Sequence, residues 1–196
     1  NNRTRNSLMN NRKFLGGFTL VELLVTLAVV AVITSITVPS MNNLVQRSQR
    51  HSAVSEAIAL INLARNTAIM EQRTITVCPL DLSHKCVAEW NTRPITVFRD
   101  DNSDRILDDS ADIIRVGTIP ENGYWTGNTA SRPYLRFFPN GMASYAIGNM
   151  VWCPSNRDSK LAAQIVINMG GRPRLSEDHD DDGLIEDANG NAVNCS

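Results

Sequence analysis

The chain has little histidine and shows none of the common catalytic motifs. Its three histidines stand far apart in a sequence of 196 residues, at His51, His84 and His179. No Ser-His-Asp spacing, phosphate-binding glycine loop or zinc motif occurs around them. We therefore expect a protein that is not an enzyme, needs no cofactor and has no small-molecule substrate.

The cysteines lack the C-x-x-C spacing that is typical of zinc sites. They stand at Cys78, Cys86, Cys153 and Cys195. An even number in a region expected outside the cytoplasm favours two disulfides, with three possible connectivities. Cys78 and Cys86 would close a short loop, and Cys153 and Cys195 would then tie the C-terminal tail to the domain. A metal site is the alternative, but few histidines are available to complete it.

Acidic residues are absent from the first 17 positions, which hold Arg3, Arg5, Arg12 and Lys13. Without this segment the net charge of −1 gives way to 15 basic against 20 acidic residues. Such an acidic remainder is not a general nucleic-acid binder, so any contact with DNA has to be local. The length suits one folded domain plus an anchor.

Residues 18–38 form one apolar run with a single charge, Glu22. A helix of this length spans roughly 30 Å, the hydrocarbon thickness of a bilayer. The basic flank before it predicts a single-pass helix with the C-terminal domain outside the cytoplasm. A secretory signal peptide is usually shorter and is followed by a small-residue cleavage site, which is not evident here. A plain signal anchor stays open on hydropathy alone.

Glu22 is unexpected in this run, because a carboxylate in a membrane helix costs about 2–3 kcal/mol. It therefore suggests a partner. If cleavage left Phe18 with a free amine, Glu22 of one subunit could pair with that amine on another. The acid could instead snorkel or take up a proton.

Residues 17–22, GFTLVE, closely resemble the type III signal of type IV prepilins and type II secretion pseudopilins. The resemblance implies that a prepilin peptidase cuts between Gly17 and Phe18 and methylates the new N-terminus. It also implies that Glu22 serves filament assembly. Pro39 fits as well, since anchor helices of this family often bend or melt at a proline.

The true start of the leader is open, because the chain begins with Asn1 and Met9 would give the compact leader MNNRKFLGG. We expect a leader over residues 1–17, a transmembrane or filament-core helix over 18–39, and a periplasmic or extracellular domain over 40–196.

After Pro39, apolar residues repeat at spacings of three and four to about Arg73, which predicts that the helix continues. The expected fold is α+β: a long N-terminal helix, hydrophobic in its first half, packed on an antiparallel sheet. Alternation and turn residues predict six strands. They are Thr74–Cys78, Ile95–Arg99, Asp112–Val116, Tyr134–Phe138, Met150–Cys153 and Gln164–Asn168.

The domain resembles the GspH/FimT group of minor pilins, which includes FimT and FimU. Members often show Cys-Pro, a second cysteine, a tryptophan and then a strand that runs into Phe-x-Asp-x-Asn. Residues 78–102 follow this order, with Trp90 after the second cysteine and Phe98 in the strand. Residues 137–144, FFPNGMAS, and 151–156, VWCPSN, also resemble strand and turn elements of the group.

Two acidic stretches partly match a calcium loop. Asp178–Gly183 has acids at alternate positions and glycine sixth, but Asn189 stands at position twelve, where an EF-hand has glutamate. Asp100, Asn102 and Asp104 form a second partial match, in which Arg105 replaces the glycine. Solvated acidic turns are the favoured interpretation, and we assign no metal site.

Gly171-Arg172-Pro173-Arg174 matches the Gly-Arg-x-Arg pattern with which FimT-like proteins bind DNA in natural transformation. Two arginines at a strand end can hold phosphates without reading sequence. They can equally be solvated charges, and the nearby acids would repel phosphate.

The leading hypothesis is therefore a minor pilin that joins, or primes assembly of, a type IV pilus in a tip or initiation complex. Its partners would be other minor and major pilins, the prepilin peptidase and the bacterial inner membrane, before transfer to the cell surface. DNA reception for transformation is a second hypothesis. A GspH-like pseudopilin of a type II secretion system is the alternative.

Overall fold

The computed structural model describes residues 18–128, 132–144 and 148–195, apart from the side chains of residues 36–40, 43 and 128. The expected leader, with Met9 and Gly17, lies outside the described residues. At the end of the predicted span, including Pro39, only the backbone is described. Contacts divide the chain into residues 1–42 and residues 43–196.

One helix, α1, runs from Leu20 to Glu71. The sequence predicted its continuation past Pro39, and its end lies two residues before the expected one. Residues 43–71 of α1 carry one buried face, with apolar side chains that recur every three or four residues. The buried residues of this face are Val54, Ala57, Leu60, Ile61, Ala64 and Ala68.

The C-terminal end of α1 is fixed by a left-handed residue and an ion pair. Gln72 has a φ of 54°, a conformation that closes a helix, and its Nε2 donates to the Ile69 carbonyl at 2.7 Å. Arg99 donates to both carboxylate oxygens of Glu71, at 2.7 and 2.8 Å. These hydrogen bonds lower the pKa of the Glu71 carboxyl. The last turn of the helix is therefore bound to the strand that carries Arg99.

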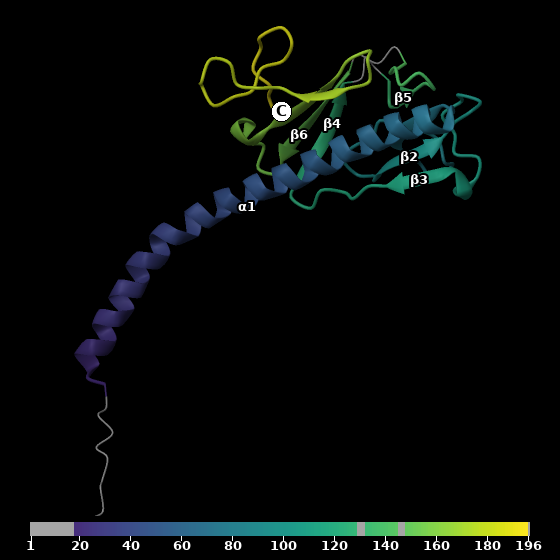
Figure 1. Cartoon of the computed structure of the whole chain (residues 1–196). Coiled ribbons are helices and arrows are strands. Elements are labelled where there is room, and N and C mark those ends of the chain that lie inside the picture. Colours follow the sequence, from purple (N-terminus) through teal and green to yellow (C-terminus); the bar gives the residue numbers. More distant parts are fainter. Residues whose placement is uncertain (1–17, 129–131, 145–147, 196) are drawn as a thin grey trace, which may run out of the picture. The chain divides into compact units, whose positions relative to one another are not determined.

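Eight strands in the described residues form two antiparallel sheets (Figure 1). The first has the order β3-β2-β1-β5 and the second β4-β6-β7-β8. The strands of the first are β1 (Ile75–Pro79), β2 (Ile95–Arg99), β3 (Ile113–Val116) and β5 (Leu135–Phe137). Those of the second are β4 (Gly123–Asn128), β6 (Gly148–Pro154), β7 (Ala163–Ile167) and β8 (Pro173–Leu175). Two single-turn 3-10 helices, η1 (Ser110–Asp112) and η2 (Ser159–Leu161), precede β3 and β7.

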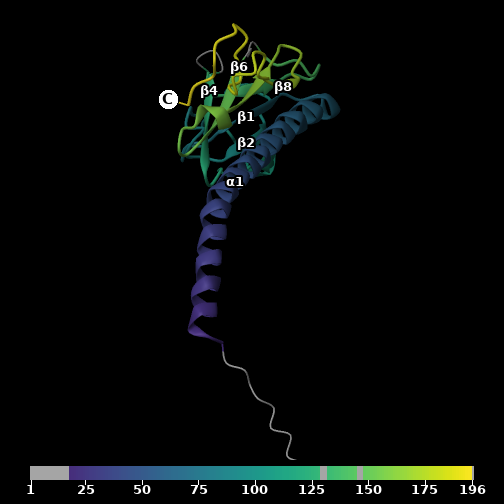
Figure 2. The ribbon, with the colours of Figure 1, turned by 90° about the vertical axis from the view of Figure 1, so that its left-hand side faces the viewer.

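The largest buried cluster joins the second half of α1 to both sheets. One cluster of buried residues combines Ala64 of α1 with Val77 of β1 and Ile165 of β7, among others. Figure 2 shows this part of α1 beside β1 and β2. Because every described buried cluster lies within residues 53–195, this unit has a core of its own.

The α+β class with a helix packed on antiparallel strands is as the sequence predicted, and all six predicted strands are present with small shifts at their ends. The prediction missed β4 and β8, and it did not separate two sheets. β4 begins at Gly123, and glycine in a short window is more typical of a turn than of a strand. A Cβ added to Gly127 would lie 2.8 Å from Nε1 of Trp90, so this glycine makes room for an indole.

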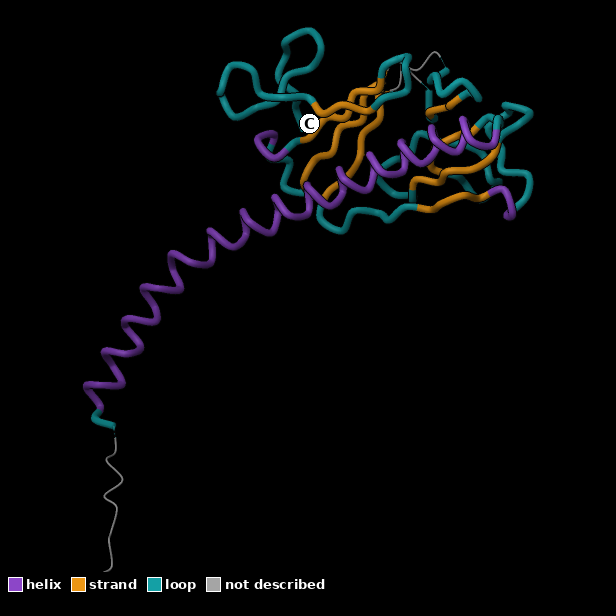
Figure 3. Tube along the Cα trace, viewed as in Figure 1, coloured by secondary structure: helices purple, strands orange, loops and turns teal. Residues whose placement is uncertain are grey.

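Two disulfides tie loops to the sheets, and they join the pairs that the sequence suggested. Cys78 pairs with Cys86, eight residues on, and Cys153 of β6 pairs with Cys195, 42 residues on. Cys195 lies in a small buried cluster with Ile185 and Val193. The second bridge therefore holds the long tail that follows β8, which is drawn as loops in Figure 3.

The longer bridge should stabilise the fold more, since it restricts the unfolded chain over a longer loop. We expect the double variant C153S/C195S to lose about 4 kcal/mol and C78S/C86S about 2.5 kcal/mol of unfolding free energy. Urea unfolding of residues 43–196 measures both values. A larger loss for the short loop would contradict this ranking.

Candidate functional site

The start of α1 presents an apolar surface that carries one acid. Phe18 is 83% exposed and Leu20 74% exposed, and large apolar side chains stay exposed as far as Ile33. Glu22 lies in the first turn, where its backbone N–H donates to Thr19 Oγ1 at 3.2 Å. Thr19 and Glu22 are thus spaced as in a capping box. The Glu22 carboxylate has no hydrogen-bond partner among the described residues.

Among the described residues, no helix is both long enough and apolar enough to cross a membrane.

The two candidate DNA-binding arginines flank the start of β8, an edge strand of the second sheet. The turn before them is docked on α1, because Arg65 Nε donates to the carbonyls of Gly141 and Gly170 at 3.1 and 3.3 Å. Gly171 has a φ of +72°, and a Cβ there would lie 3.2 Å from the Phe137 ring. Only glycine fits this crowded, left-handed position. The turn therefore fixes where the arginines emerge.

Arg172 and Arg174 are both exposed. Arg174 lies in β8 opposite Val166 of β7, and Arg172 ends the turn directly before the strand. In the described part of the chain neither guanidinium has a hydrogen bond or an ion pair. Both charges are therefore available to a ligand, as phosphate binding needs.

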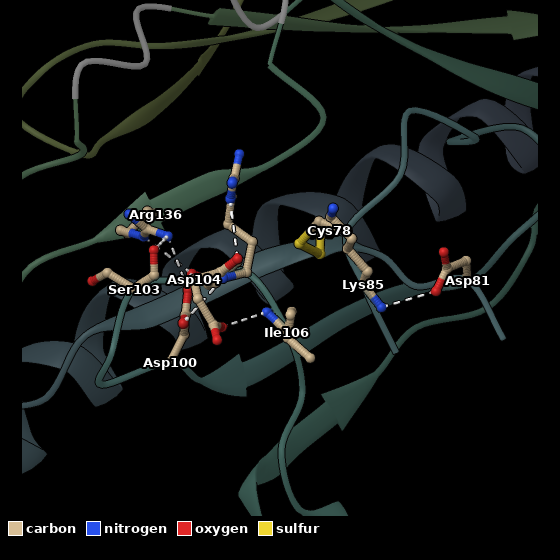
Figure 4. Close-up of a disulfide and its surroundings, with 11 residues drawn as sticks. Cys78, Asp81, Lys85, Asp100, Ser103, Asp104, Ile106 and Arg136 are labelled. Carbon is tan, nitrogen blue, oxygen red and sulfur yellow. Dashed lines mark hydrogen bonds and ion pairs between the residues drawn. A yellow bond between two sulfur atoms is a disulfide. The ribbon is translucent and has the colours of Figure 1, made fainter. Parts of the chain in front are cut away.

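Asp100 is a buried ion-pair residue and not a solvated turn residue (Figure 4). Its side chain is 0% exposed, and its Oδ2 accepts from Arg136 Nη2 at 3.0 Å and from Thr76 Oγ1 at 2.6 Å. Arg136 also donates to the Ser103 carbonyl at 2.8 Å and lies over the Tyr134 ring, 5.0 Å from its centroid. The expectation of a solvated acid is therefore wrong for Asp100. Its partner, Arg136, lies in β5, which is distant in sequence and could not be read from the loop alone.

The other polar residues of this loop are engaged in closing it. Ile106 N donates to Asp104 Oδ1 at 2.8 Å, and Asn102 Nδ2 donates to the carboxylates of Asp104 and Asp108. Asp100 is paired with Arg136, and the other acids accept hydrogen bonds within the loop. The acidic residues that resemble a calcium loop therefore stabilise the fold here.

The acids of the tail are arranged differently. Asp178, Asp180 and Asp182 converge with Glu186, and one carboxylate oxygen from each lies within 4.8 Å of the others. Glu186 Oε2 accepts from the backbone N–H of His179 at 2.8 Å and lies 3.2 Å from its Nδ1. The hydrogen bond with Glu186, and a second with the Glu177 carbonyl, raise the pKa of His179. The sequence did not single out Glu186.

A helix with an exposed apolar start, packed through its second half on antiparallel strands, is the architecture of a pilin-like protein. Residues 53–171 match the family described as type II transport protein GspH. The match covers more than half of the chain, so the chain belongs to the GspH family. It ends one residue before Arg172 and leaves out the acidic tail. No curated protein matches the sequence significantly.

Solved structures of minor pilins are similar to this one. The type IV minor pilin FimU of Pseudomonas aeruginosa has a TM-score of 0.50 and 18% identity, over 67% of this chain and 90% of that one. The minor pseudopilin EpsH of the Vibrio cholerae type 2 secretion system has a TM-score of 0.47 and 14% identity, over 65% and 95%. FimU thus shares the fold, which is that of a minor pilin.

The buried pair Asp100–Arg136 should matter far more to stability than the exposed pair beside it. Removing one partner of a buried pair leaves an uncompensated charge, so Asp100→Asn should cost about 3 kcal/mol or more. Asp101 pairs with Arg73, and these side chains are 53% and 40% exposed. Asp101→Asn should therefore cost less than about 1 kcal/mol. Equal losses for both variants in urea unfolding would show that burial of the pair is unimportant.

Proposed function

We propose that the protein is a minor pilin that joins, or primes assembly of, a type IV pilus. A prepilin peptidase would cut between Gly17 and Phe18, and the helix would hold the protein in the bacterial inner membrane until assembly. The observation that carries this proposal is the exposed apolar start of α1, which belongs to a chain whose other unit has its own core. An apolar surface of this extent needs lipid or other subunits to cover it.

Glu22 is the residue we propose for subunit recognition. It is the only acid in the run over residues 18–38, and its carboxylate has no partner in the described residues. In a low-dielectric filament core, the amine of Phe18 on a neighbouring subunit would compensate this charge. The partners would be major pilins and other minor pilins with the same helix.

The presence of an acid at position 22 also has a local explanation, which is capping of the helix N-terminus. As the fourth residue of a Thr-x-x-Glu pattern, Glu22 can cap the helix N-terminus and interact favourably with the helix dipole. The assembly role and the capping role make different demands, since glutamine can replace glutamate in a capping box but carries no charge.

Glu22→Gln should therefore abolish incorporation into filaments while the helix and the membrane-bound pool are retained, because only the charge is lost. Thr19→Ala removes the cap hydrogen bond, at about 1 kcal/mol, but keeps the charge, so it should assemble. Immunoblots of sheared filaments and of membranes measure both pools. Normal assembly of the glutamine variant together with failure of the Thr19 variant would leave Glu22 with a capping role alone.

A pseudopilin of a type II secretion system is the alternative, and the family description, which names type II transport, favours it. The similar structure of FimU, a type IV minor pilin, favours the pilus. Both systems use a helix of this kind. Deletion of the gene, scored for piliation, secretion and transformation, separates them. Loss of pili supports the pilus, loss of secretion alone the secretion system, and loss of DNA uptake with intact pili a receptor.

DNA binding by Arg172 and Arg174 is a second proposed activity. Its support is the exposure of both arginines, their closeness in sequence at the start of β8 and their freedom from ion pairs in the described residues. Contacts of this kind hold phosphates at a fixed place without selecting sequence.

R172A/R174A should weaken binding of duplex DNA at low salt, regardless of its sequence. The slope of log K against log salt should fall by about 2, because two phosphate contacts are lost. Fluorescence anisotropy with residues 43–196 measures both quantities. Arg115 is exposed on β3 of the other sheet, so Arg115→Ala is the matched control. Unchanged binding by the double variant would exclude these arginines as the site.

A further inference from the structure

The tail after β8 contains a nine-residue loop whose spacing differs from that of an EF-hand. Counted from Asp178, aspartates occupy positions one, three and five, and glycine occupies position six. Gly183 has a φ of +87°, which places a sharp turn after the third aspartate. The next acid that reaches the group is Glu186 at position nine. The EF-hand pattern, with glutamate at position twelve, therefore does not describe this group of acids.

One oxygen in this loop has no hydrogen-bond partner, although it is buried. Asp178 Oδ2 accepts from Gly183 N at 2.8 Å, which fixes the orientation of the carboxylate. Asp178 Oδ1 is sealed from solvent and accepts no hydrogen bond within the described structure. A buried carboxylate oxygen without a partner costs free energy, about 1–3 kcal/mol or more for a charged group. This atom is where a ligand is needed.

The negative charges of the carboxylates around Asp178 Oδ1 are only partly compensated. Four carboxylates meet within 4.8 Å, and like charges at this distance repel. The nearby basic side chains compensate this repulsion only in part. His179 contacts Glu186 and is exposed, and no ion pair joins Lys160 to the aspartates in the described residues. A cation among the four carboxylates would remove the repulsion and give Asp178 Oδ1 a partner.

We propose that Asp178, Asp180, Asp182 and Glu186 bind one calcium ion. The donors are all oxygen, which hard cations prefer, and a loop of carboxylates with backbone carbonyls suits the six to eight ligands of Ca²⁺. Mg²⁺ demands near-octahedral geometry and keeps several waters, so it fits a four-carboxylate loop less well. Zinc would prefer cysteine or histidine, and the only such side chain at the loop is His179.

The ion would fasten the tail to the domain. The loop begins two residues after Ser176, whose hydroxyl donates to Gln164 of β7 at 2.6 Å. It ends beside Ile185, which packs with Val193 and the Cys153–Cys195 bridge. Calcium would thus close the segment between two points already held to the second sheet. Bound calcium should raise the thermal stability of the protein, because it binds the folded loop alone.

The test is calorimetric titration of the full chain in detergent, stripped of metal, with calcium alone and with magnesium alone. Wild type should bind one Ca²⁺ with a Kd of about 10⁻³ M or tighter, as extracellular modules do, and Mg²⁺ at least about tenfold more weakly. Asp180→Asn and Glu186→Gln should each weaken Ca²⁺ binding at least about tenfold, since each removes one charged ligand.

Asp181 provides the matched control. It lies in the same loop and is exposed, but it is not one of the four converging acids. Its φ of +60° is one that asparagine tolerates, so Asp181→Asn removes the same charge without strain. We expect its calcium affinity to fall less than about threefold, as a screened charge effect.

Two results would overturn the proposal. One is wild-type protein that takes up no calcium at millimolar concentration. The other is an equal loss of affinity for Asp181→Asn and Asp180→Asn, which would indicate a diffuse attraction to negative charge. Thermal unfolding in calcium and in chelator, with all variants, confirms that each one folds. These outcomes do not depend on filament assembly.

Discussion

The second half of α1 must bury one face against two sheets at once, and the rest of the domain is arranged around this contact. Ala57, Ala64 and Ala68 are no more than 3% exposed, and their small side chains let strands approach the helix closely. A larger side chain at any of them would push a sheet away. Arg65, on the same helix, then reaches the turn before β8. The place of Arg172 and Arg174 is therefore set by helix packing as much as by their own strand.

Local patterns were enough to predict most of the fold. β1, β2 and β7 alternate or cluster β-branched residues, and the helix repeats its apolar positions, so each is visible in a short window. β4 is not, because its glycines indicate turns when read locally. Gly123 and Gly127 stand in a strand since Trp152 and Trp90 lie against them, and that contact exists only in the folded chain. The split into two sheets depends on the same long-range packing.

The functional and structural sites also differ in whether local sequence was enough to predict them. The number and positions of the cysteines suggested the two pairs without excluding the other connectivities. The cap formed by Thr19 and Glu22 could have been found from their spacing of three. The partner of Asp100 could not, because Arg136 lies 36 residues further along the chain. Glu186 was missed for another reason. It is close in sequence to Asp178, but the expected template placed the last acid three positions later.

The arginines and the acids of the tail lie close together in the sequence. Arg174 and Asp178 are four residues apart, so at most about 14 Å of chain separates them. This upper limit is less than twice the Debye length of about 8 Å at physiological salt, so the repulsion of phosphate by the acids is weakened but present. A dication would cancel two of the four negative charges of the loop. Calcium occupancy would then raise the affinity of the arginines for DNA, and linkage requires that DNA raise the affinity for calcium equally. The salt dependence of either equilibrium would contain both effects, because only a few residues of chain separate the two sites.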